Sequence, residues 1–370
     1  MAVRRVSLAA ATTLWCVLLA WGADSVFAMP TVTMPNNVRP ASPFSYRGLL
    51  GNERFLQYVK VTGIDGDLFD ITLGPDGAVW FTETASNAIG RMDAKYRVSS
   101  YPVPASAGVP VAITSGPDGN LWFTLGGGSQ QGIGRITPAG VITIFPFGTA
   151  FGTELDITAG PDGNLWFTDS SNNMVGRVTP QGAIKEFALP TPGAPNGIVS
   201  GPDKHLWICE EGALTRSQNV PGRILRMTTA VQFKSYILSP PSWTTAPEFI
   251  AVGSDRKLWF TEQDQTAVPY HVESITLHGA ISEFSLLPTS SSNPVEPIGR
   301  ITSGSDGNVW LTEGLYNVDR VTPSGGITRF VMPPPPGTTL PPQPRGITTG
   351  PDDNLWWVET SSGSIGILQP

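Results

Sequence analysis

The hydrophobic and polar residues follow one pattern that recurs seven times along the chain. Its clearest copy, residues 71–83, reads Ile-Thr-Leu-Gly-Pro-Asp-Gly-Ala-Val-Trp-Phe-Thr-Glu, which is an apolar segment, a polar turn and a second apolar segment. A glycine precedes each tryptophan by six positions and an aspartate precedes it by four. The seven tryptophans are Trp80, Trp122, Trp166, Trp207, Trp259, Trp310 and Trp356. Seven such coincidences at spacings of 41 to 52 residues indicate an internal repeat.

Each repeat predicts four short strands. The Ile-Thr before the glycine forms the first, a Pro-Asp-Gly turn follows, and the tryptophan segment, such as residues 165–168, forms the second. Ile-Gly-Arg-Ile-Thr-Pro, as at 133–138, forms the third, and residues 183–189 alternate apolar and polar side chains as the fourth. A period in the forties with several short strands is typical of a β-propeller. We therefore expect an all-β, seven-bladed propeller of four-stranded antiparallel blades, with tryptophan between blades.

The two ends of the repeat region predict how the ring closes. The last repeat stops at residues 365–370, which match a third strand, so its fourth strand is missing. Residues 55–61 precede the first repeat and have the sequence of a spare fourth strand. We expect this N-terminal strand to complete the last blade and to remove an open sheet edge. The propeller then spans 55–370, with an irregular leader at 29–54 and insertions in blades 4 and 5.

Residues 1–28 have the features of a secretory signal peptide. Arg4 and Arg5 precede an apolar stretch from Val6 to Trp21, and Val26-Phe27-Ala28 matches a cleavage site. We therefore expect an exported protein, periplasmic or secreted, with no membrane association after cleavage. The alternative is an uncleaved membrane anchor, for which the apolar run is short.

Composition narrows the class of protein further. The chain has 41 Gly and 35 Pro, yet its 11 Trp, 16 Phe and 7 Tyr argue against disorder. Cleavage takes away two arginines and one aspartate, so the formal charge of −7 becomes −8. An acidic chain disfavours nucleic acid and anionic lipid as partners. Cys209 is the one cysteine left after cleavage, so no disulfide can form within the mature chain and packing must stabilise the fold. We expect a monomer.

An acidic residue follows six of the seven tryptophans by three positions. Equivalent positions of a propeller share one radius and height, so we expect these side chains to encircle the axis near one mouth. Carboxylates held close together raise one another's pKa values or recruit a cation, here Mg²⁺ or Ca²⁺. The alternative is that each caps a loop or pairs with an arginine of the third strand, such as Arg91, Arg135 or Arg177. The seven positions are Glu83, Leu125, Asp169, Glu210, Glu262, Glu313 and Glu359.

Other chemistry-bearing residues give weaker signals. His205, His271 and His278 are spaced too far apart for a metal site, and turn chemistry predicts exposed histidines. Asp65, Asp67 and Asp70 could bind calcium, although a turn also accounts for them.

The repeat text itself resembles a known family. Gly-Pro-Asp-Gly-Asn-Leu-Trp-Phe-Thr at 116–124 and 160–168, with Ile-Gly-Arg-Ile-Thr-Pro at 133–138, is similar to the virginiamycin B (streptogramin B) lyases. The resemblance implies a seven-bladed propeller that uses magnesium to open a cyclic depsipeptide antibiotic by elimination. It also implies a Glu-Pro-His-Gly stretch in the last blade with a general-base histidine, a second histidine one blade earlier, and glutamates that hold the metal.

At these family positions the present sequence departs from the pattern. The last blade reads Gln343-Pro344-Arg345-Gly346, so Arg345, which stays protonated, stands in the general-base position. Gln343 replaces a metal carboxylate, Gly299 replaces the second histidine, and Glu359 matches the remaining glutamate. The equivalent positions, which we call the mouth positions, are Phe69, Val111, Leu155, Asn196, Glu248, Gly299 and Arg345.

Three functions stay open at this point. We favour an exported propeller that binds a small molecule or peptide at its axial mouth. The ligand-binding candidates are Arg345, Gln343, Glu248 and Asn196, and the metal candidates are Glu359, Glu313 and Glu262. The second possibility is a metal-dependent enzyme, either a carbon–oxygen lyase of the virginiamycin B type or a lactonase-like hydrolase. The third is a protein-interaction platform without a small-molecule site.

Overall fold

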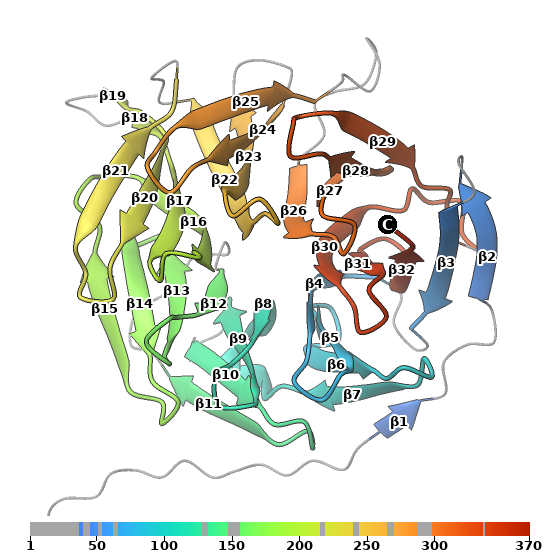
Figure 1. The fold of residues 1–370 in the computed structure, drawn as a ribbon. Helices are drawn as coiled ribbons and strands as arrows, with labels where there is room; N and C mark the ends of the chain where they lie inside the picture. Colours follow the sequence, from blue (N-terminus) through green and yellow to red (C-terminus); the bar gives the residue numbers. More distant parts are fainter. Residues whose placement is uncertain are drawn as a thin grey trace, which may run out of the picture. The chain divides into compact units, whose positions relative to one another are not determined.

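The predicted seven-bladed ring is confirmed. The computed structural model describes residues 37–39, 45–50, 54–61, 66–127, 132–146, 156–214, 219–239, 244–264, 270–286, 298–335 and 337–370, all within the unit Thr31–Pro370. In these residues, antiparallel sheets of four or five strands stand around a common axis (Figure 1). Blade 4 also carries a small hairpin, β18 (Ala213–Leu214) and β19 (Asn219–Val220), at one of the two predicted insertions.

Each blade runs from an innermost strand to an outermost one. The innermost strands are β4 (Leu68–Leu73), β8 (Val109–Ser115), β12 (Ile157–Ala159), β16 (Ala194–Ser200), β22 (Thr245–Val252), β26 (Ile298–Ser303) and β30 (Pro344–Thr349). The second strands are β5 (Val79–Glu83), β9 (Leu121–Gly126), β13 (Leu165–Asp169), β17 (Leu206–Glu211), β23 (Leu258–Asp264), β27 (Val309–Glu313) and β31 (Leu355–Glu359). The third strands are β6 (Ala88–Met92), β10 (Gly132–Ile136), β14 (Met174–Val178), β20 (Arg223–Met227), β24 (His271–Ile275), β28 (Asn317–Val321) and β32 (Ser364–Leu368). The outermost repeat strands are β7 (Val98–Pro102), β11 (Ile142–Pro146), β15 (Ile184–Ala188), β21 (Phe233–Ile237), β25 (Ile281–Ser285), β29 (Ile327–Val331) and β3 (Arg54–Lys60).

The ring closes as the sequence predicts. Strand β3 pairs with β32 in the last blade, with Val59 opposite Ile365 and Lys60 opposite Ser364. Each innermost strand contacts the innermost strand of the next blade, and β30 of the last blade contacts β4 of the first. The first and last blades are therefore neighbours like any other pair (Figure 1).

The expected irregular leader is wrong for two of its segments. Strand β1 (Asn37–Arg39) pairs with β7 of blade 1, and β2 (Ser45–Leu50) pairs with β3 of blade 7. Both segments add a fifth strand to an outer edge, where unpaired backbone groups favour strand addition. The signal-peptide residues 1–28 lie outside the described part of the chain. Within that part, no helix is long and apolar enough to cross a membrane, and the one helix is a 3₁₀ turn, η1 (Ala105–Ala107).

The repeated tryptophans fill the space between blades. Trp166 is fully buried and packs with residues of blade 4, including Ile198 and Leu206. Its ring stacks on Phe187 of its own blade at a centroid distance of 5.8 Å. Its indole N–H donates to Asp162 Oδ1 at 3.1 Å, so the turn aspartate also positions the ring. The same bond, at 2.8–3.1 Å, occurs in all seven repeats.

The glycine of Ile-Gly-Arg has a steric reason. Gly176 on β14 lies opposite Phe167 on β13, and a Cβ at this position would stand 1.9 Å from Phe167 Cζ. Gly134 and Gly90 have the same relation to Phe123 and Phe81. Blades 1 to 3 therefore pair a second-strand phenylalanine with a third-strand glycine, because the ring occupies the space that a side chain would need.

Threonines of the second strand connect the innermost strands. Thr168 Oγ1 accepts from the backbone N–H of Asp156 in its own blade at 3.0 Å and donates to the carbonyl of Asn196 in the next blade at 2.7 Å. Thr82 bonds in the same way to Asp70 N–H and to the carbonyl of Val111. These bonds fix the innermost strands, and with them every side chain near the axis.

Candidate functional site

The acidic residues after the tryptophans do not form a ring around the axis, which corrects the prediction. Glu83 is buried and accepts hydrogen bonds from Ser86 and from Ser100 on the outermost strand β7. Glu313 pairs with Arg329 on β29, also an outermost strand. These side chains lie between blades and point away from the axis, because both faces of a second strand are covered by neighbouring blades.

The arginines of the third strand have partners other than those considered. Arg91 Nε lies 2.7 Å from Asp76 Oδ2, and Arg135 Nη1 lies 3.8 Å from Asp118 Oδ2, so they pair with turn aspartates. The Arg177 guanidinium lies over the Trp166 ring at 5.6 Å. Among the acidic residues that follow the tryptophans, Glu210 does pair with a third-strand arginine, since Arg223 Nε on β20 lies 3.0 Å from Glu210 Oε2.

The three metal candidates each stay within their own blade. Glu359 is fully buried and accepts the indole N–H of Trp357. Burial raises the pKa of Glu359 to about 8, although that hydrogen bond opposes the increase. Burial and the neighbouring Asp319 carboxyl raise the pKa of Glu313 to about 9, although the Arg329 guanidinium opposes the increase. The third candidate, Glu262, lies against Glu273, whose pKa burial and Glu262 raise to about 10.

These residues do not fit the magnesium ion that the family resemblance implies. In the part of the chain that the structure describes, no three His, Cys, Asp or Glu side chains are placed to hold a metal ion. With a pKa of about 8, Glu359 is mostly protonated at neutral pH, and a neutral carboxyl is a poor ligand for a hard cation. Gln343, which precedes β30, offers an uncharged amide in place of the second carboxylate.

The ligand-binding candidates lie at or beside the innermost strands, toward the end where these strands begin. Asn196 and Glu248 are half-buried on the adjacent strands β16 and β22. Arg345 is exposed on β30, and its guanidinium lies over the Phe69 ring of blade 1 at 4.5 Å. Gln343 is half-buried and has a positive φ of 55°. The structure thus places Arg345 beside Phe69 and places Asn196 beside Glu248.

Gly299 occupies a position without room for a side chain. A Cβ there would stand 2.0 Å from Thr312 Oγ1 on the second strand of the same blade. Of the remaining mouth positions, Val111 is buried on β8, and Leu155 lies outside the described residues.

The structure also describes the three histidines and two of the three aspartates considered for calcium. His278 is exposed, as predicted, but His271 and His205 are half-buried beside carboxylates, with His271 Nδ1 at 2.6 Å from Glu283 Oε1. Of the calcium candidates, Asp65 lies outside the described residues and Asp67 is exposed. Asp70 is buried and pairs with Arg300.

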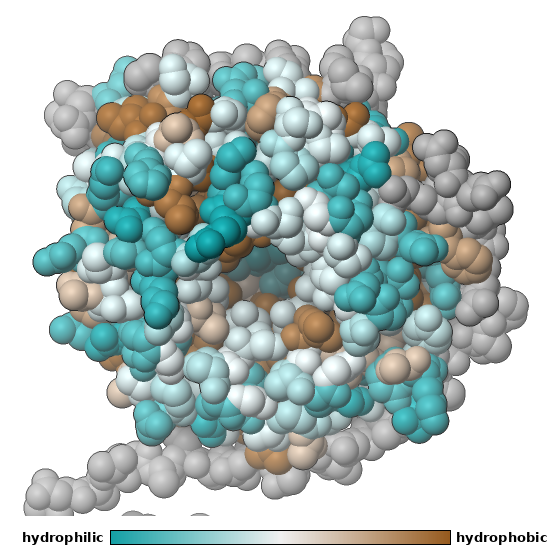
Figure 2. Space-filling view, in the orientation of Figure 1, coloured by the Kyte–Doolittle hydropathy of each residue, from teal (hydrophilic) through white to brown (hydrophobic). Residues whose placement is uncertain are grey.

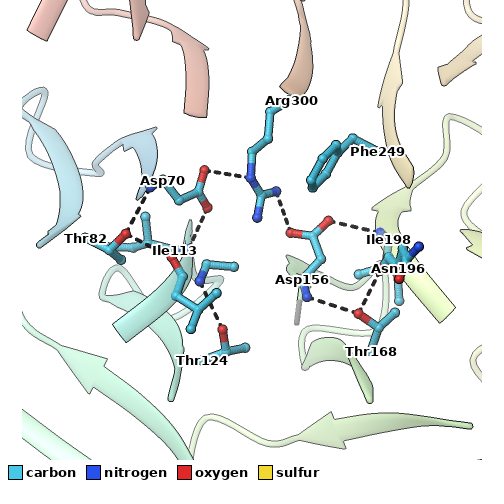
Figure 3. A network of polar contacts seen from close by, with 12 residues as sticks. Asp70, Thr82, Ile113, Thr124, Asp156, Thr168, Asn196, Ile198, Phe249 and Arg300 are labelled. Carbon is cyan, nitrogen blue, oxygen red and sulfur yellow. Dashed lines mark hydrogen bonds and ion pairs between the residues drawn. The ribbon is translucent and has the colours of Figure 1, made fainter. Parts of the chain in front are cut away.

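A charged cluster that the sequence did not reveal lies at the axis itself (Figure 3). Arg300 of blade 6 reaches across to two carboxylates: its Nε lies 3.0 Å from Asp70 Oδ1 of blade 1, and its Nη1 lies 2.7 Å from Asp156 Oδ1 of blade 3. The guanidinium also lies over the Phe249 ring of blade 5 at 5.0 Å. We call Asp70, Asp156 and Arg300 the axial cluster.

Backbone groups complete the axial cluster. Asp70 Oδ2 accepts from the N–H of Ile113 in blade 2 at 2.9 Å, and Asp156 Oδ2 accepts from the N–H of Ile198 in blade 4 at 3.0 Å. Burial raises the pKa of Asp70 to about 6, with Arg300 opposing and Asp156 adding to the increase. These contacts join innermost strands from five blades, so the cluster is held rigidly.

A signal for the axial cluster was present in the repeat. Its members follow the mouth positions by one residue, where side chains converge on the axis. The equivalent residues are Asp70, Ala112, Asp156, Gly197, Phe249, Arg300 and Gly346. The space-filling view is hollowed at the centre of the ring, with hydrophilic surface inside the hollow (Figure 2).

Comparison with known proteins agrees with the repeat text. The model of the virginiamycin B lyase family matches residues 55–216 and 209–370. A streptogramin B lyase structure is 29% identical with a TM-score of 0.71, covering 85% of this chain and 97% of that one. The selenomethionine-substituted virginiamycin B lyase of Staphylococcus aureus is 28% identical with a TM-score of 0.71, covering 86% of this chain and 100% of that one. A catalytically inactive variant of the S. aureus lyase, solved with quinupristin, gives the same values.

More distant structures share the fold alone. The hydrazine synthase of Kuenenia stuttgartiensis is 14% identical with a TM-score of 0.65, covering 84% of this chain and 97% of that one. No match was found among curated protein sequences. Because the family model covers nearly the whole propeller, this chain belongs to the virginiamycin B lyase family.

Proposed function

We propose that this protein is an exported propeller that binds a small molecule or peptide over its axial mouth, and that it does not carry out the lyase reaction of its family. Arg345 is the observation that carries the proposal. It stands where the resemblance implies a general base, and a guanidinium stays protonated at every physiological pH. Its position over the Phe69 ring at 4.5 Å further favours the cation.

The position implied for the second histidine supports the same view. A histidine at Gly299 would collide with the Thr312 hydroxyl, so the Thr312 side chain would have to move and give up its hydrogen bond to the Arg345 carbonyl. The misfit of Glu359 and Gln343 to magnesium, described above, points in the same direction. Elimination needs a base to remove a proton, and neither Arg345 nor Gly299 supplies one at the two positions where the resemblance implies histidines.

The mouth nevertheless offers groups suited to binding. An exposed cation beside an aromatic ring lies on blades 7 and 1, and an amide and a carboxylate, Asn196 and Glu248, lie on blades 4 and 5. Ligand sites commonly combine a concave surface with a few polar groups that fix orientation. The hollow at the ring centre supplies the concavity (Figure 2).

Incubation with quinupristin, which is present in the structure of an inactive relative, tests the catalytic half of the proposal. We expect the antibiotic to stay cyclic even with added Mg²⁺, while an active virginiamycin B lyase opens it under the same conditions. Ring opening by elimination leaves the mass unchanged, so the products must be separated by chromatography and identified by fragmentation. A linear unsaturated product above the no-enzyme background would contradict the proposal.

Binding is tested with the same molecule by isothermal titration. Arg345→Ala removes the cation from the mouth and is expected to weaken quinupristin binding by about tenfold or more, the effect of losing one interfacial contact of 1–2 kcal/mol. Arg97→Ala is the matched control, since its side chain is 65% exposed and pairs with Asp93 within its own turn. Equal affinities of the wild type and the Arg345 variant would place the ligand elsewhere.

A further inference from the structure

We propose that the axial cluster selects an uncharged amide group of the ligand. This inference rests on the proposed function, because Asp70 and Arg300 directly follow the mouth positions Phe69 and Gly299 and so adjoin the same hollow. It adds a site at the axis, distinct from the residues that the family resemblance points to.

The first requirement is a hydrogen-bond donor that the protein does not use itself. Arg300 Nε pairs with Asp70, and Arg300 Nη1 pairs with Asp156. None of the described residues accepts from Nη2, which points into the space between the innermost strands (Figure 3). The Arg300 side chain is 16% exposed, so part of it stays accessible to a ligand. Phe249 lies against the guanidinium and holds its plane.

The second requirement is an acceptor beside that donor. Asp70 Oδ1 forms an ion pair with Arg300 Nε, and the other three carboxylate oxygens of Asp70 and Asp156 each accept one hydrogen bond, from Arg300 or from a backbone N–H. A carboxylate oxygen can accept a second bond, so acceptor capacity remains next to Nη2. A carboxamide or peptide group has the complementary pattern, since its oxygen accepts and its N–H donates.

Charge excludes the competing ligand groups. With both aspartates ionised, the axial cluster carries one net negative charge, which repels a ligand carboxylate. An ammonium group could use the remaining acceptor capacity, but it would place a second cation against the Arg300 guanidinium and would leave the Nη2 donors unpaired. An uncharged amide meets neither obstacle, and an apolar group would leave the Nη2 donors unpaired at a cost in free energy.

The direct test uses acetamide, acetate and methylammonium as probes of the wild-type protein. The ¹⁵N–¹H side-chain signals of Arg300 are followed by NMR and assigned from their absence in Arg300→Lys. We expect acetamide to shift the Arg300 signals saturably, and acetate to need at least about tenfold higher concentration because like charges meet. A crystal soaked with acetamide should show its oxygen within hydrogen-bond distance of Nη2. Tighter binding of acetate or of methylammonium than of acetamide, or no saturable shift with acetamide, would overturn the inference.

A variant pair separates recognition from general effects of the probe. Arg300→Lys keeps the charge but lacks the fork that offers Nη2, so saturable binding of acetamide should be lost. Arg320→Lys is the control, because Arg320 on β28 is not part of the axial cluster. Its guanidinium lies over the Trp310 ring and donates a hydrogen bond to Thr328. Its acetamide binding should equal that of the wild type. If Arg300→Lys does not fold, the wild-type titration and the soaked crystal decide alone.

Failure of this inference is distinguishable from failure of the proposed function. If quinupristin binds in an Arg345-dependent way while acetamide leaves the Arg300 signals unmoved, the amide site is wrong and the binding propeller stands. If acetamide binds at Arg300 and quinupristin does not bind, the axial site stands and the mouth requires another ligand. If neither binds, the amide site is wrong and the mouth again requires another ligand.

Discussion

Replacing Trp166 by alanine is expected to lower the free energy of unfolding by about 3–5 kcal/mol, the usual loss for a large buried aromatic. The ring is fully buried between blades 3 and 4 and stacks on Phe187. Its removal leaves a cavity that a closed ring of blades cannot collapse into, and it leaves Asp162 without the indole donor. Urea unfolding followed by far-UV circular dichroism measures the change.

Two controls give this prediction its meaning. Trp166→Phe keeps most of the ring and should lose less stability than the alanine variant. Ile237→Ala removes a side chain that is 53% exposed and should change the free energy of unfolding by about 0.5 kcal/mol or less. A Trp166→Ala variant as stable as Ile237→Ala would mean that the blades are not held together by their tryptophans.

Replacing Glu359 by glutamine is expected to remove part of the pH dependence of stability. Burial raises the pKa of Glu359 in the folded protein to about 8, above its ordinary value of 4.5, so the folded state favours the protonated form. The stability from this group is therefore fully present below about pH 4.5 and is lost as the pH rises through about 8. Glutamine stays neutral and keeps an oxygen that can accept the Trp357 indole N–H.

The measurement compares urea unfolding of the wild type and Glu359→Gln at pH 5 and at pH 9. The wild type should lose a few kcal/mol more than the variant over this interval, in line with the size of the pKa shift. Burial also raises the pKa of Glu210, Glu273 and Glu313, but these groups are present in both proteins and cancel in the difference. Parallel pH profiles would show that Glu359 is ionised in the folded state, and magnesium binding there would again need to be considered.

The sequence was sufficient to predict the architecture because the residues of each repeat position one another. The turn aspartate bonds the tryptophan, and the third-strand glycine admits a phenylalanine ring, as Asp162 and Gly176 show. Closure by β3 was also predictable, since its sequence is that of a missing strand. The short strands β1 and β2 were not, because an edge pairs through backbone groups that leave little trace in the side chains.

The candidate site was less accessible to sequence reasoning. Periodicity gives the repeat position of a residue but not the direction of its side chain, so Glu83 and Glu313 were assigned to the axis although they point outward. The axial cluster was missed for the opposite reason. Asp70, Asp156 and Arg300 differ in type and occur in blades far apart in the chain, so no single repeat marks them. Only the closed ring brings both carboxylates within 3.0 Å of the Arg300 guanidinium.

The composite last blade constrains the order in which the molecule can assemble. Its two outer strands come from residues 45–50 and 54–60 and its other three from residues 344–368, so pairs such as Lys60 and Ser364 form only once synthesis has reached the C-terminus. Contacts this distant in the chain impose a large loop-closure entropy and slow folding. Blades 1 to 6 can form as the chain emerges, whereas the seventh must wait, and a nascent chain halted before residue 364 retains an unsealed ring.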